Sequence, residues 1–193
     1  MPATSRDYAD LPIDKLRRAD RQVTEDGWMI DLLDRATVGY LATVDDGQPF
    51  INSNLFVYDA NAHIIYMHTA RVGRTRANIE LHEKVCFTIT EMGRLLPADE
   101  ALEMSVEYAG VVVFGSAHIL ENVTEERHGL QLLLDKYFPH LKSGVHYRAM
   151  TDEELARTSV YRIEIERWTG KRKKVKDDFP GAFLHGNPPF EQI

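Results

Sequence analysis

The chain has 193 residues, of which 23 are basic and 30 are acidic, so its formal net charge is −7. This length and a hydrophobic content of 44% favour one domain with a sizeable core, and a single cysteine excludes an internal disulfide. Because the acidic balance argues against general nucleic-acid binding, and the sequence has neither a signal-type stretch nor a membrane-length apolar run, we expect a cytoplasmic protein with no nucleic-acid or membrane partner.

The chain begins with a polar, charged stretch that gives way to a helical pattern. Residues 1–22 have few large apolar side chains and are predicted to form an N-terminal arm. In residues 24–36 the apolar side chains recur at helical spacing, and Thr24 is a candidate N-cap. The folded domain is expected to begin at this helix.

The middle of the chain has the composition of β-strands separated by turn signals. Asp45-Asp46-Gly47-Gln48 is typical of a hairpin turn, residues 92–105 are predicted to form a loop, and Gly110 and Gly115 are expected bend or bulge points. The predicted strands cover residues 38–44, 49–58, 63–69, 85–90, 106–120 and 160–168. Because short connections force antiparallel neighbours, the pattern predicts a mainly β protein, a small six-stranded antiparallel barrel with flanking helices.

Further helices are predicted between these strands. One covers residues 74–81, directly after Gly73, and another covers residues 124–138 with Thr124 as its cap. The sequence Thr151-Asp152-Glu153-Glu154 matches a capping box and predicts a short helix.

A basic cluster marks the end of the domain. Residues 171–176 are rich in lysine and arginine, but Asp177 and Asp178 follow immediately and no aromatic residues are interleaved. A solvated tail is therefore favoured over a nucleic-acid patch. We predict an arm over residues 1–22, one domain over residues 23–170 and a polar tail over residues 171–193.

The stretch from residue 68 to residue 76 combines a strand end, a glycine turn and a helix start. A helix start offers unpaired N–H groups and the positive end of the helix dipole, and three arginines, a threonine hydroxyl and a histidine accompany it here. Each charge-assisted hydrogen bond to a phosphate contributes about 1.5 to 3 kcal/mol. The pattern indicates an anion site. On spacing alone, a helix whose arginines are only solvated explains the same residues equally well.

Four other residues are candidates for chemistry or ligand binding: His68, Trp168, Lys171 and Ser105. His68 near a strand end is more often structural, but beside a phosphate-type turn it becomes a candidate proton donor. Trp168 either covers an aromatic ligand or belongs to the core, and Lys171 can reach a phosphate. No histidine spacing is typical of a metal site, so no metal is assigned, and Ser105 lacks a nucleophile-elbow context.

Several separated segments carry a wider pattern, and in chain order they are Pro49-Phe50-Ile51, Tyr66-Met67-His68-Thr69, Val72-Gly73-Arg74, Glu103-Met104-Ser105-Val106-Glu107-Tyr108, Val113-Phe114-Gly115, Arg157-Thr158-Ser159-Val160-Tyr161 and Arg167-Trp168-Thr169-Gly170-Lys171. Their order and spacing resemble the FMN-binding split-barrel proteins related to pyridoxamine 5′-phosphate oxidase. Within that family the chain is most similar to the nitroimidazole-resistance reductase branch. The resemblance extends from about Trp28 to Lys171, which is most of the chain.

The resemblance implies a six-stranded split barrel that works as a homodimer and binds FMN at the subunit interface. It implies that the FMN site contains Asn52, Ser53, Asn54, Leu55, His68, Thr69, Val72, Gly73, Arg74, Thr75, Ser105, Trp168 and Lys171, some of them from the partner subunit. Of these, Gly73, Arg74 and Thr75 match the phosphate-binding turn, and His68 matches a histidine linked to catalysis. Related sequences often have proline where this chain has Ser53, which bears on the contacts at the flavin edge.

The function that this resemblance implies is an FMN-dependent oxidoreductase. Reduced flavin would pass a hydride from its N5 atom to a small planar acceptor, for which a nitroimidazole-type nitroaromatic is the candidate, and His68 or a water would supply the proton. Three alternatives stay open: oxidation of pyridoxamine 5′-phosphate, a non-catalytic flavin carrier or sensor, and a haem-binding protein.

Overall fold

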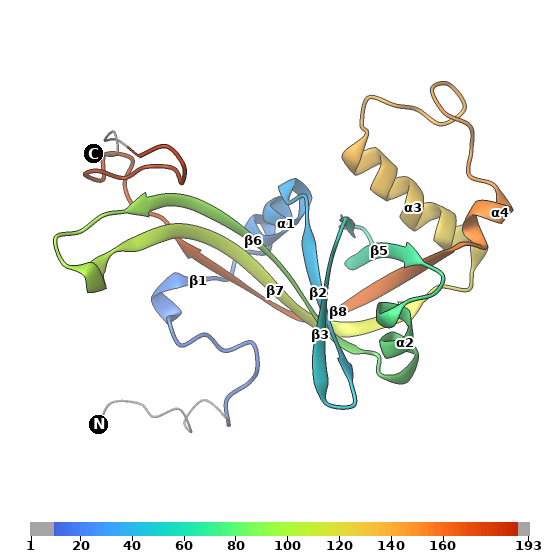
Figure 1. Ribbon diagram of the computed structural model, residues 1–193, viewed down its shortest axis with the longest axis horizontal. Helices are drawn as coiled ribbons and strands as arrows, with labels where there is room; N and C mark the ends of the chain where they lie inside the picture. Colours follow the sequence, from blue (N-terminus) through green and yellow to red (C-terminus); the bar gives the residue numbers. More distant parts are fainter. Residues whose placement is uncertain (1–9, 189–193) are drawn as a thin grey trace.

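The computed structural model describes residues 10–188. In this range the strands are β1 (Gln22–Val23), β2 (Gly39–Asp45), β3 (Gln48–Asn54), β4 (Phe56–Asp59), β5 (Ile64–Ala70), β6 (Lys84–Leu96), β7 (Ser105–Ile119) and β8 (Thr158–Lys173). The helices are α1 (Asp26–Arg35), α2 (Arg74–Leu81), α3 (Val123–Tyr137) and α4 (Asp152–Leu155), with 3-10 turns η2 (Ala19–Arg21) and η3 (Ala101–Glu103). In Figure 1 the long strands β6, β7 and β8 run along the molecule, and the β2–β3 hairpin crosses them near its middle.

The strands form one antiparallel sheet in the order β3-β2-β6-β7-β8-β5-β4, and β1 pairs with the free side of β8. The first and last strands of this order are joined in the chain by Leu55 alone. A sheet whose two edges are one residue apart has to curl until they approach, which gives the split barrel. The mainly β antiparallel architecture is thus confirmed.

The strand count was wrong, because the described residues form eight strands rather than six. The predicted strand over residues 49–58 is interrupted at Leu55, whose N–H donates to the side chain of Asn54 at 2.9 Å instead of to a neighbouring strand. As a result β3 pairs with β2, while β4 pairs with β5 at the other edge. The two-residue strand β1 supplies the eighth.

The long strands extend beyond their predicted limits. The loop expected over residues 92–105 is wrong in its first part, since β6 continues through Leu96 with a register shift between Met92 and Leu95. Pairing with β7 overrides the polar local composition there. Strand β8 likewise continues through Lys173, three residues past the predicted end of the domain at residue 170.

One of the two predicted bends is present. The register between β7 and β8 shifts at Phe114 and Gly115, whereas Gly110 lies in continuous ladder. A Cβ at Gly115 would lie 1.9 Å from the carbonyl oxygen of Glu164, so only glycine fits this close approach of two backbones.

The helices lie where the periodicity predicted them, but two caps differ. Glu25 precedes α1 without a side-chain cap, in place of Thr24. Asn122 caps α3 by accepting from two backbone N–H groups, in place of Thr124. The capping box at Thr151 is confirmed, since its side chain accepts from N3 and Glu154 reaches back to the N-cap N–H.

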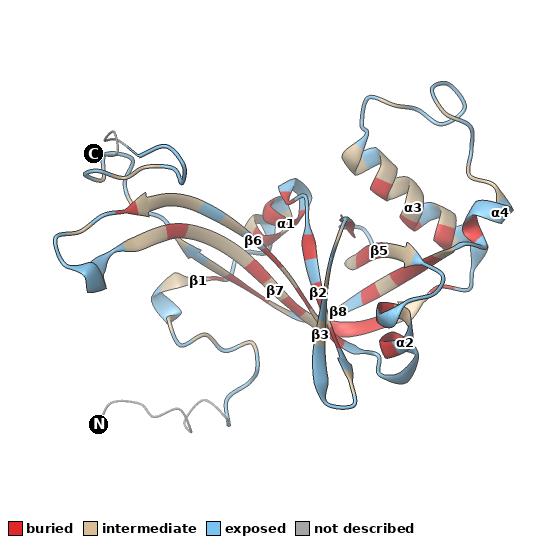
Figure 2. Cartoon of the chain, viewed as in Figure 1, coloured by how far each residue is buried: buried red, intermediate tan, exposed pale blue. Residues whose placement is uncertain are grey.

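The main core fills the barrel and is closed by α1 and α2, while α3 packs on the outside (Figure 2). The interior cluster includes Leu32, Leu33, Leu41, Phe56, Ile65, Met67, Ile79, Phe87, Ile89, Val111, Val113, Tyr161 and Ile163. A second cluster lies between α3 and the outer side of β4, β5 and β8, and contains Val57, Tyr66, Leu120, Leu133 and Val160. No helix among residues 10–188 is both long and apolar enough to span a membrane.

The described part of the predicted N-terminal arm packs against the sheet on the side opposite α1. Asp14 lies 3.5 Å from Arg167 in an exposed ion pair, and Ile13 lines a shallow groove of about 360 Å³ together with Ala42, Cys86 and Phe114. Residues 1–9 lie outside the described residues. We refer below to this side of β2, β3, β6 and β7 as the open face.

Candidate functional site

The turn between β5 and α2 has the elements of an anion site. Gly73 is the N-cap of α2 and supplies no side-chain cap, so the first-turn N–H groups have no side chain bound to them. Next to them, the buried hydroxyl of Thr75 accepts from the Asn52 side chain at 3.2 Å. The structure therefore brings β3 and the start of α2 together, and unpaired helix N–H groups are suited to a phosphate.

Two of the three arginines of this stretch, Arg74 and Arg76, already have side-chain partners. A guanidinium nitrogen of Arg74 lies 2.6 Å from a carboxylate oxygen of Asp45, in an exposed ion pair. Arg76 pairs with Glu80 at 2.7 Å and donates to the hydroxyl of Ser159 at 2.9 Å. An anion at the turn consequently competes with Asp45 for Arg74, while the helix N–H groups face no such competitor among the described residues.

Adjacent side chains on β5 point to opposite sides of the sheet. The hydroxyl of Thr69 lies 2.7 Å from that of Tyr161, a side chain of the barrel interior. His68 points outward, like Tyr66, and lines a hollow beneath α3. The side chains of Thr69 and His68 are therefore neighbours in sequence but lie on opposite sides of the sheet.

His68 is a neutral imidazole with a buried, unsatisfied nitrogen. Its Nδ1 atom is buried and has no hydrogen-bond partner in the described part of the chain. Burial lowers the pKa of the His68 imidazole below its ordinary value of 6.5, because the charged form loses hydration. At neutral pH this ring can accept a proton or bind a metal ion, but it is a poor acid.

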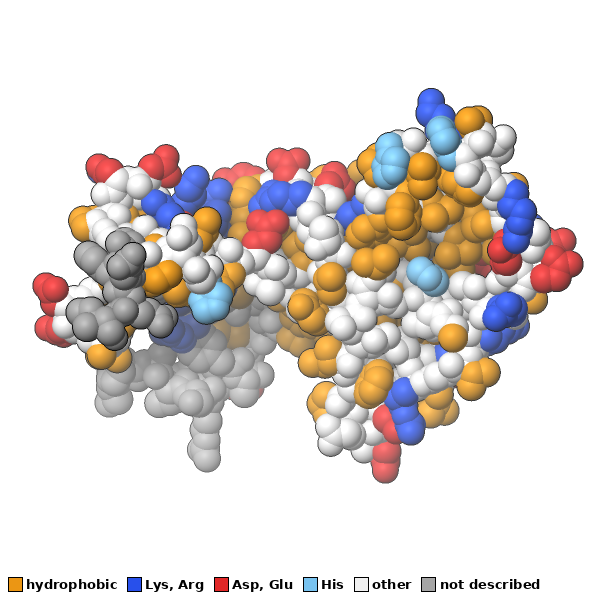
Figure 3. Space-filling model, turned by 45° about the horizontal axis from the view of Figure 1, so that its top comes forward, with side chains coloured by type: hydrophobic (Ala, Val, Ile, Leu, Met, Phe, Trp, Pro, Cys, Tyr) orange, Lys and Arg blue, Asp and Glu red, His pale blue; other side chains and the backbone are white. Residues whose placement is uncertain are grey.

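The hollow beside His68 is large and mostly apolar. It has a volume of about 500 Å³ and lies between α3, the segment 138–150, α4 and the ends of β5 and β8. Its walls include Leu55, Leu130, Leu133, Leu134, Tyr137, Phe138, Tyr147, Met150 and Leu155, with Arg148 and Glu154 as charged residues. Figure 3 shows hydrophobic side chains gathered in a hollow on this side of the molecule, with a histidine among them. Its size and lining suit an organic ligand.

Sequence reasoning missed this hollow as a site. The helix over residues 124–138 has an apolar face with Leu130, Leu133, Leu134 and Tyr137, and such a face usually packs entirely in a core. Here the part of α3 nearest its C-terminus is left uncovered beside His68. The signal that could have revealed it is the cluster Tyr137, Phe138 and Tyr147, which adds aromatic side chains beyond the end of the helix.

The residues of β3 that the resemblance assigns to the flavin edge, Asn52 to Asn54, have side chains on alternating sides of the sheet. Asn54 donates from its side-chain amide to the backbone carbonyl of His68 at 2.6 Å, which ties β3 to β5. Ser53 pairs with Tyr40 of β2 on the open face. Val72 is 88% exposed, so its side chain lies in solvent rather than in the wall of a site.

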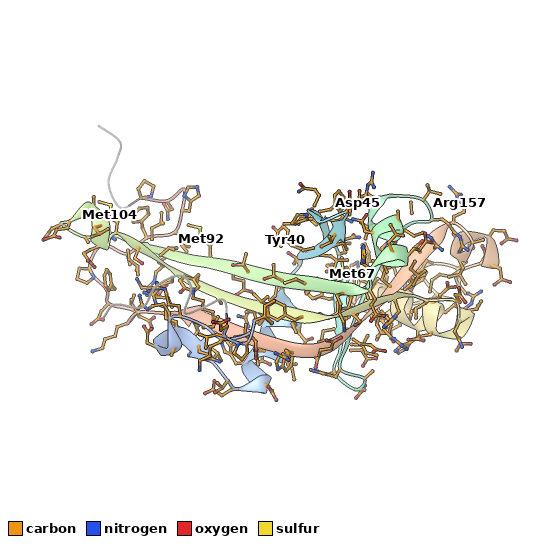
Figure 4. All side chains as sticks on the ribbon, turned by 90° about the horizontal axis from the view of Figure 1, so that it is seen from below. Tyr40, Asp45, Met67, Met92, Met104 and Arg157 are labelled. Carbon is orange, nitrogen blue, oxygen red and sulfur yellow. The ribbon has the colours of Figure 1, made fainter. Side chains whose placement is uncertain are left out.

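Ser105, Trp168 and Lys171 lie far from the turn within one chain. Val160 of β8 pairs with His68, and Lys171 lies 11 positions further along the same strand, which is about 36 Å at the rise of an extended chain. In Figure 4, Met104, the neighbour of Ser105, lies at one end of the molecule, and Asp45, the partner of Arg74, lies toward the other. These three residues can join the turn only in an assembly of two chains.

Trp168 and Lys171 also face opposite sides of β8. The Trp168 ring lies 4.7 Å from the His63 ring and 6.1 Å from the Tyr58 ring, between centroids, and packs against the main core. The Lys171 ammonium lies 5.5 Å from the centroid of the Tyr108 ring. Within this chain Trp168 is therefore a core residue, which was one of the two alternatives that the sequence left open.

Comparison with known proteins adds a family. A family model described as pyridoxamine 5′-phosphate oxidase matches residues 25–172 of the chain. A search of curated proteins finds no match.

Solved structures share the fold. The FAD and haem binding protein of Mycobacterium smegmatis is 22% identical, with a TM-score of 0.73, covering 80% of this chain and 74% of that one. The flavocytochrome Anf3 of Azotobacter vinelandii is 17% identical, with a TM-score of 0.72 and coverages of 93% and 87%. A candidate 5-nitroimidazole antibiotic resistance protein of Bacteroides thetaiotaomicron VPI-5482 is 17% identical, with a TM-score of 0.66 and coverages of 78% and 86%.

Proposed function

Because the chain belongs to the pyridoxamine 5′-phosphate oxidase family, we propose that it is a flavin-dependent oxidoreductase that binds FMN through the turn before α2. The observation that carries the proposal is the set of first-turn N–H groups at Gly73, which have no side-chain cap and lie beside Arg74 and Thr75. A phosphate monoester is the ligand that such a turn suits.

The residues of the turn have separate roles in this proposal. The N–H groups of α2 and the hydroxyl of Thr75 hold the phosphate oxygens, and Arg74 neutralises their charge after leaving Asp45. Asn52 orients Thr75 from β3 through their 3.2 Å hydrogen bond. When bound, a flavin supplies hydride transfer through its N5 atom.

His68 has a defined part in proton transfer. Since burial lowers the pKa of its imidazole, the ring is neutral at pH 7 and holds no proton that it readily donates. We therefore assign proton supply at neutral pH to water, and to His68 only at acidic pH. Its ring instead forms one wall of the hollow in which a small planar acceptor binds.

The acceptor class follows from the hollow. Its apolar and aromatic walls suit a planar, weakly polar molecule, and a nitroaromatic of the nitroimidazole type is our leading candidate. A structural neighbour described as a candidate 5-nitroimidazole antibiotic resistance protein supports this choice. Oxidation of pyridoxamine 5′-phosphate is the second enzymatic candidate, and a flavin carrier without turnover is the third.

The absorption spectrum of the purified protein tests the proposal. We expect flavin bands, and a released cofactor with the mass of FMN rather than FAD. Protein that is colourless and leaves the fluorescence of added FMN and FAD unchanged would refute flavin binding. Two assays then separate the enzymatic candidates: stopped-flow oxidation of the reduced protein by a nitroimidazole, and formation of pyridoxal 5′-phosphate. If no acceptor oxidises the reduced protein, the flavin carrier without turnover is the remaining candidate.

A haem-binding role is the second candidate function, and one observation favours it. The His68 imidazole lines a large apolar hollow whose wall also includes Arg148. His68 would be the residue that holds the iron of a bound haem, and Arg148 would pair with the haem carboxylates. Two structural neighbours, a FAD and haem binding protein and a flavocytochrome, support the same candidate.

Titration with hemin distinguishes this role. If His68 is a ligand, the full chain develops a Soret band that His68→Ala loses or shifts, while its flavin binding is retained. His128→Ala is the matched control, because His128 is half exposed and pairs with Asp59 outside the hollow. An identical Soret band in both variants would eliminate His68 as the haem ligand.

The homodimer is a proposal that completes the flavin site. Lys171 lies about 36 Å along β8 from the partner of His68, and Ser105 binds Lys173 of the same strand end, so a second chain has to supply both if they contact the same flavin. The open face provides the contact surface, since its rows of paired residues include Tyr40, Ala42, Ile51, Cys86 and Phe114. Exposed apolar sheet faces of this kind mark protein interfaces.

A further inference from the structure

A second cleft lies at the end of the molecule where α2 and α4 are found (Figure 1). Its walls come from the end of β5, α2, the segment 119–126 and α4, and we call it the Glu126 cleft. It has a volume of about 360 Å³ and shares only Leu155 with the hollow beside His68. None of the residues that the resemblance assigns to the flavin lines it, so it is a site of its own.

Glu126 places a buried carboxylate in the wall of this cleft. The residue is 7% exposed and lies in the first turns of α3. Its neighbour Glu125 pairs with Arg162, but the carboxylate of Glu126 has no ion pair or hydrogen bond in the range 10–188. A carboxylate that loses its hydration without compensation is costly, so a cationic group of a ligand would pair with it favourably.

The opposite charge in the cleft comes from Arg71, directly after β5. The N–H of Arg71 donates to the carbonyl of Arg157 at 3.1 Å, whereas its guanidinium has no partner in the described part of the chain. Arg76 lines the same cleft but is already paired with Glu80 at 2.7 Å. Because no ion pair joins either arginine to Glu126 among the described residues, a ligand lying between them can meet both charges.

The two remaining acidic side chains of the cleft are less suited to a ligand. Asp152 pairs with Arg127 at 2.6 Å, and Glu121 is exposed to solvent. An exposed carboxylate gains little from an ion pair, because water already solvates it. Glu126 is therefore the carboxylate of the cleft that gains most from a cation.

Apolar side chains form much of the remaining wall. Leu120 and Leu155 are buried, and Ile119 and Val123 also line the cleft, with Val123 51% exposed. An aliphatic group that displaces water from such a wall is bound favourably. The cleft thus suits a ligand that combines a cation, an anion and a short aliphatic part.

We propose that the Glu126 cleft binds an α-amino acid with an aliphatic side chain. The ammonium group pairs with Glu126, and the carboxylate group accepts hydrogen bonds from Arg71. The aliphatic side chain packs against Leu120 and Leu155. The volume of the cleft is near the lower end of the range for small-molecule sites, about 300 to 1,000 Å³, as expected for a ligand of this size. Nothing in this proposal depends on flavin at the turn before α2.

Isothermal titration of the full chain with L-leucine tests the proposal. Two analogues of leucine each lack one charge: isocaproate has no ammonium group, and isoamylamine has no carboxylate group. Because each analogue loses one charge-assisted pair, we expect each to bind at least about tenfold more weakly than leucine.

Two variants locate the site. Glu126→Gln and Arg71→Gln each remove one of the two charges, and we expect each to raise the Kd for leucine at least about tenfold. Glu153→Gln and Arg157→Gln are the matched controls, since both residues are exposed and lie outside the cleft, and they should leave the Kd unchanged. Thermal melts verify that each variant is folded. If Glu126→Gln unfolds, Arg71→Gln alone decides the outcome, because Arg71 is exposed.

Absence of leucine binding to the wild-type chain would overturn the proposal, and so would analogues that bind as tightly as leucine. Equal Kd values in wild type, Glu126→Gln and Arg71→Gln would show that leucine binds elsewhere, which also overturns it. Flavin binding is followed separately by fluorescence. A chain that binds leucine in the cleft but binds no flavin would refute the proposed function and leave this site standing.

Discussion

Arg74 carries a charge for which Asp45 and an incoming phosphate compete. The pair is exposed, so it contributes little to stability and opens readily. The helix N–H groups beside it have no competing side chain. In the phosphate site that we propose, the backbone N–H groups are the main donors, and Arg74 adds a charge-assisted hydrogen bond only when it leaves Asp45.

We predict that Arg74→Ala weakens FMN binding about tenfold, since one charge-assisted hydrogen bond worth about 1.5 kcal/mol is lost. Asp45→Asn should tighten binding, because it frees Arg74. Both are measured by quenching of flavin fluorescence. Arg35→Ala is the control, as Arg35 forms a comparably exposed ion pair with Glu91 away from α2. Unchanged FMN affinity in Arg74→Ala would remove the phosphate role of this residue.

His68 and Thr69 are adjacent in sequence, but their side chains lie on opposite sides of the sheet and have different surroundings. Thr69 binds Tyr161 inside the barrel, whereas the His68 ring faces the hollow beneath α3. If His68 acts in turnover with water as the proton source at neutral pH, His68→Ala should lower the rate mainly below the lowered pKa of the ring. Equal pH profiles of turnover for wild type and His68→Ala would contradict this role.

Among the elements, the β6–β7 hairpin is the one that departs most from its prediction. Its extension is held by Arg94, whose guanidinium donates to both carboxylate oxygens of Glu107 at 2.9 Å and to two backbone carbonyls of the C-terminal segment at 2.9 and 3.1 Å. Val175 donates its N–H to Glu107 at 2.9 Å, and Leu95 exchanges backbone hydrogen bonds with Phe183. Hydrogen bonds therefore attach residues 175–183, which were predicted to belong to a solvated tail, to the β6–β7 hairpin.

We predict that Glu107→Gln lowers the free energy of unfolding by about 2 kcal/mol at pH 7, because it breaks a half-buried, bidentate pair. Arg94 holds the pKa of Glu107 at about 2, below its ordinary value of 4.5. The carboxylate therefore stabilises the fold above pH 4.5, and this contribution is lost as the pH falls from 4.5 toward 2. The difference between wild type and variant should shrink over the same range.

Chemical denaturation at several pH values measures this difference. Glu91→Gln is the control, since Glu91 forms a more exposed pair with Arg35 and should cost less than about 1 kcal/mol. A Glu107→Gln variant as stable as wild type at pH 7 would show that the hairpin holds the C-terminal segment without this pair.

At the scale of the whole molecule, the open face is the feature that a single chain leaves unexplained. Ile51 is 65% exposed and pairs across the sheet with Ala42, which in turn pairs with Cys86. Soluble monomers seldom expose such a continuous apolar row. A second copy of the chain is the occupant we propose, and it would bring Ser105 and Lys171 to the turn of its partner.

We predict that light scattering of the wild-type chain gives a mass twice that of one chain. Ile51→Lys should shift this toward the monomer, because it places a charge in the centre of the contact. Val145→Lys is the control, since Val145 is 76% exposed in the segment 138–150, away from the open face. A monomeric wild type, or a dimer that Ile51→Lys leaves intact, would contradict the proposed interface.

Local sequence determined much of the fold. Period-two patterns and turn residues predicted most of the strands and their antiparallel neighbours. Helical spacing of apolar residues predicted α1 and α3, and the capping box predicted α4. The start of α2 after Gly73 was also predicted, because a glycine between a strand and a helix is a local signal. These features depend on residues close together in the chain, and short-range sterics and hydrogen bonding decide them.

Tertiary structure alone decided the rest. The pairing of β3 and β4 at opposite edges of the sheet and the continuation of β6 past Met92 depend on partner strands that lie elsewhere in the chain. The attachment of the C-terminal segment depends on Arg94, which is more than 80 residues away. The separation of His68 from Trp168 and Lys171 also depends on the tertiary structure, whereas the family resemblance implied one site that contains all three, with some residues from the partner subunit. The physical reason is that pairing and packing free energies between distant segments exceed local preferences, and they exist only once the chain has closed into the barrel.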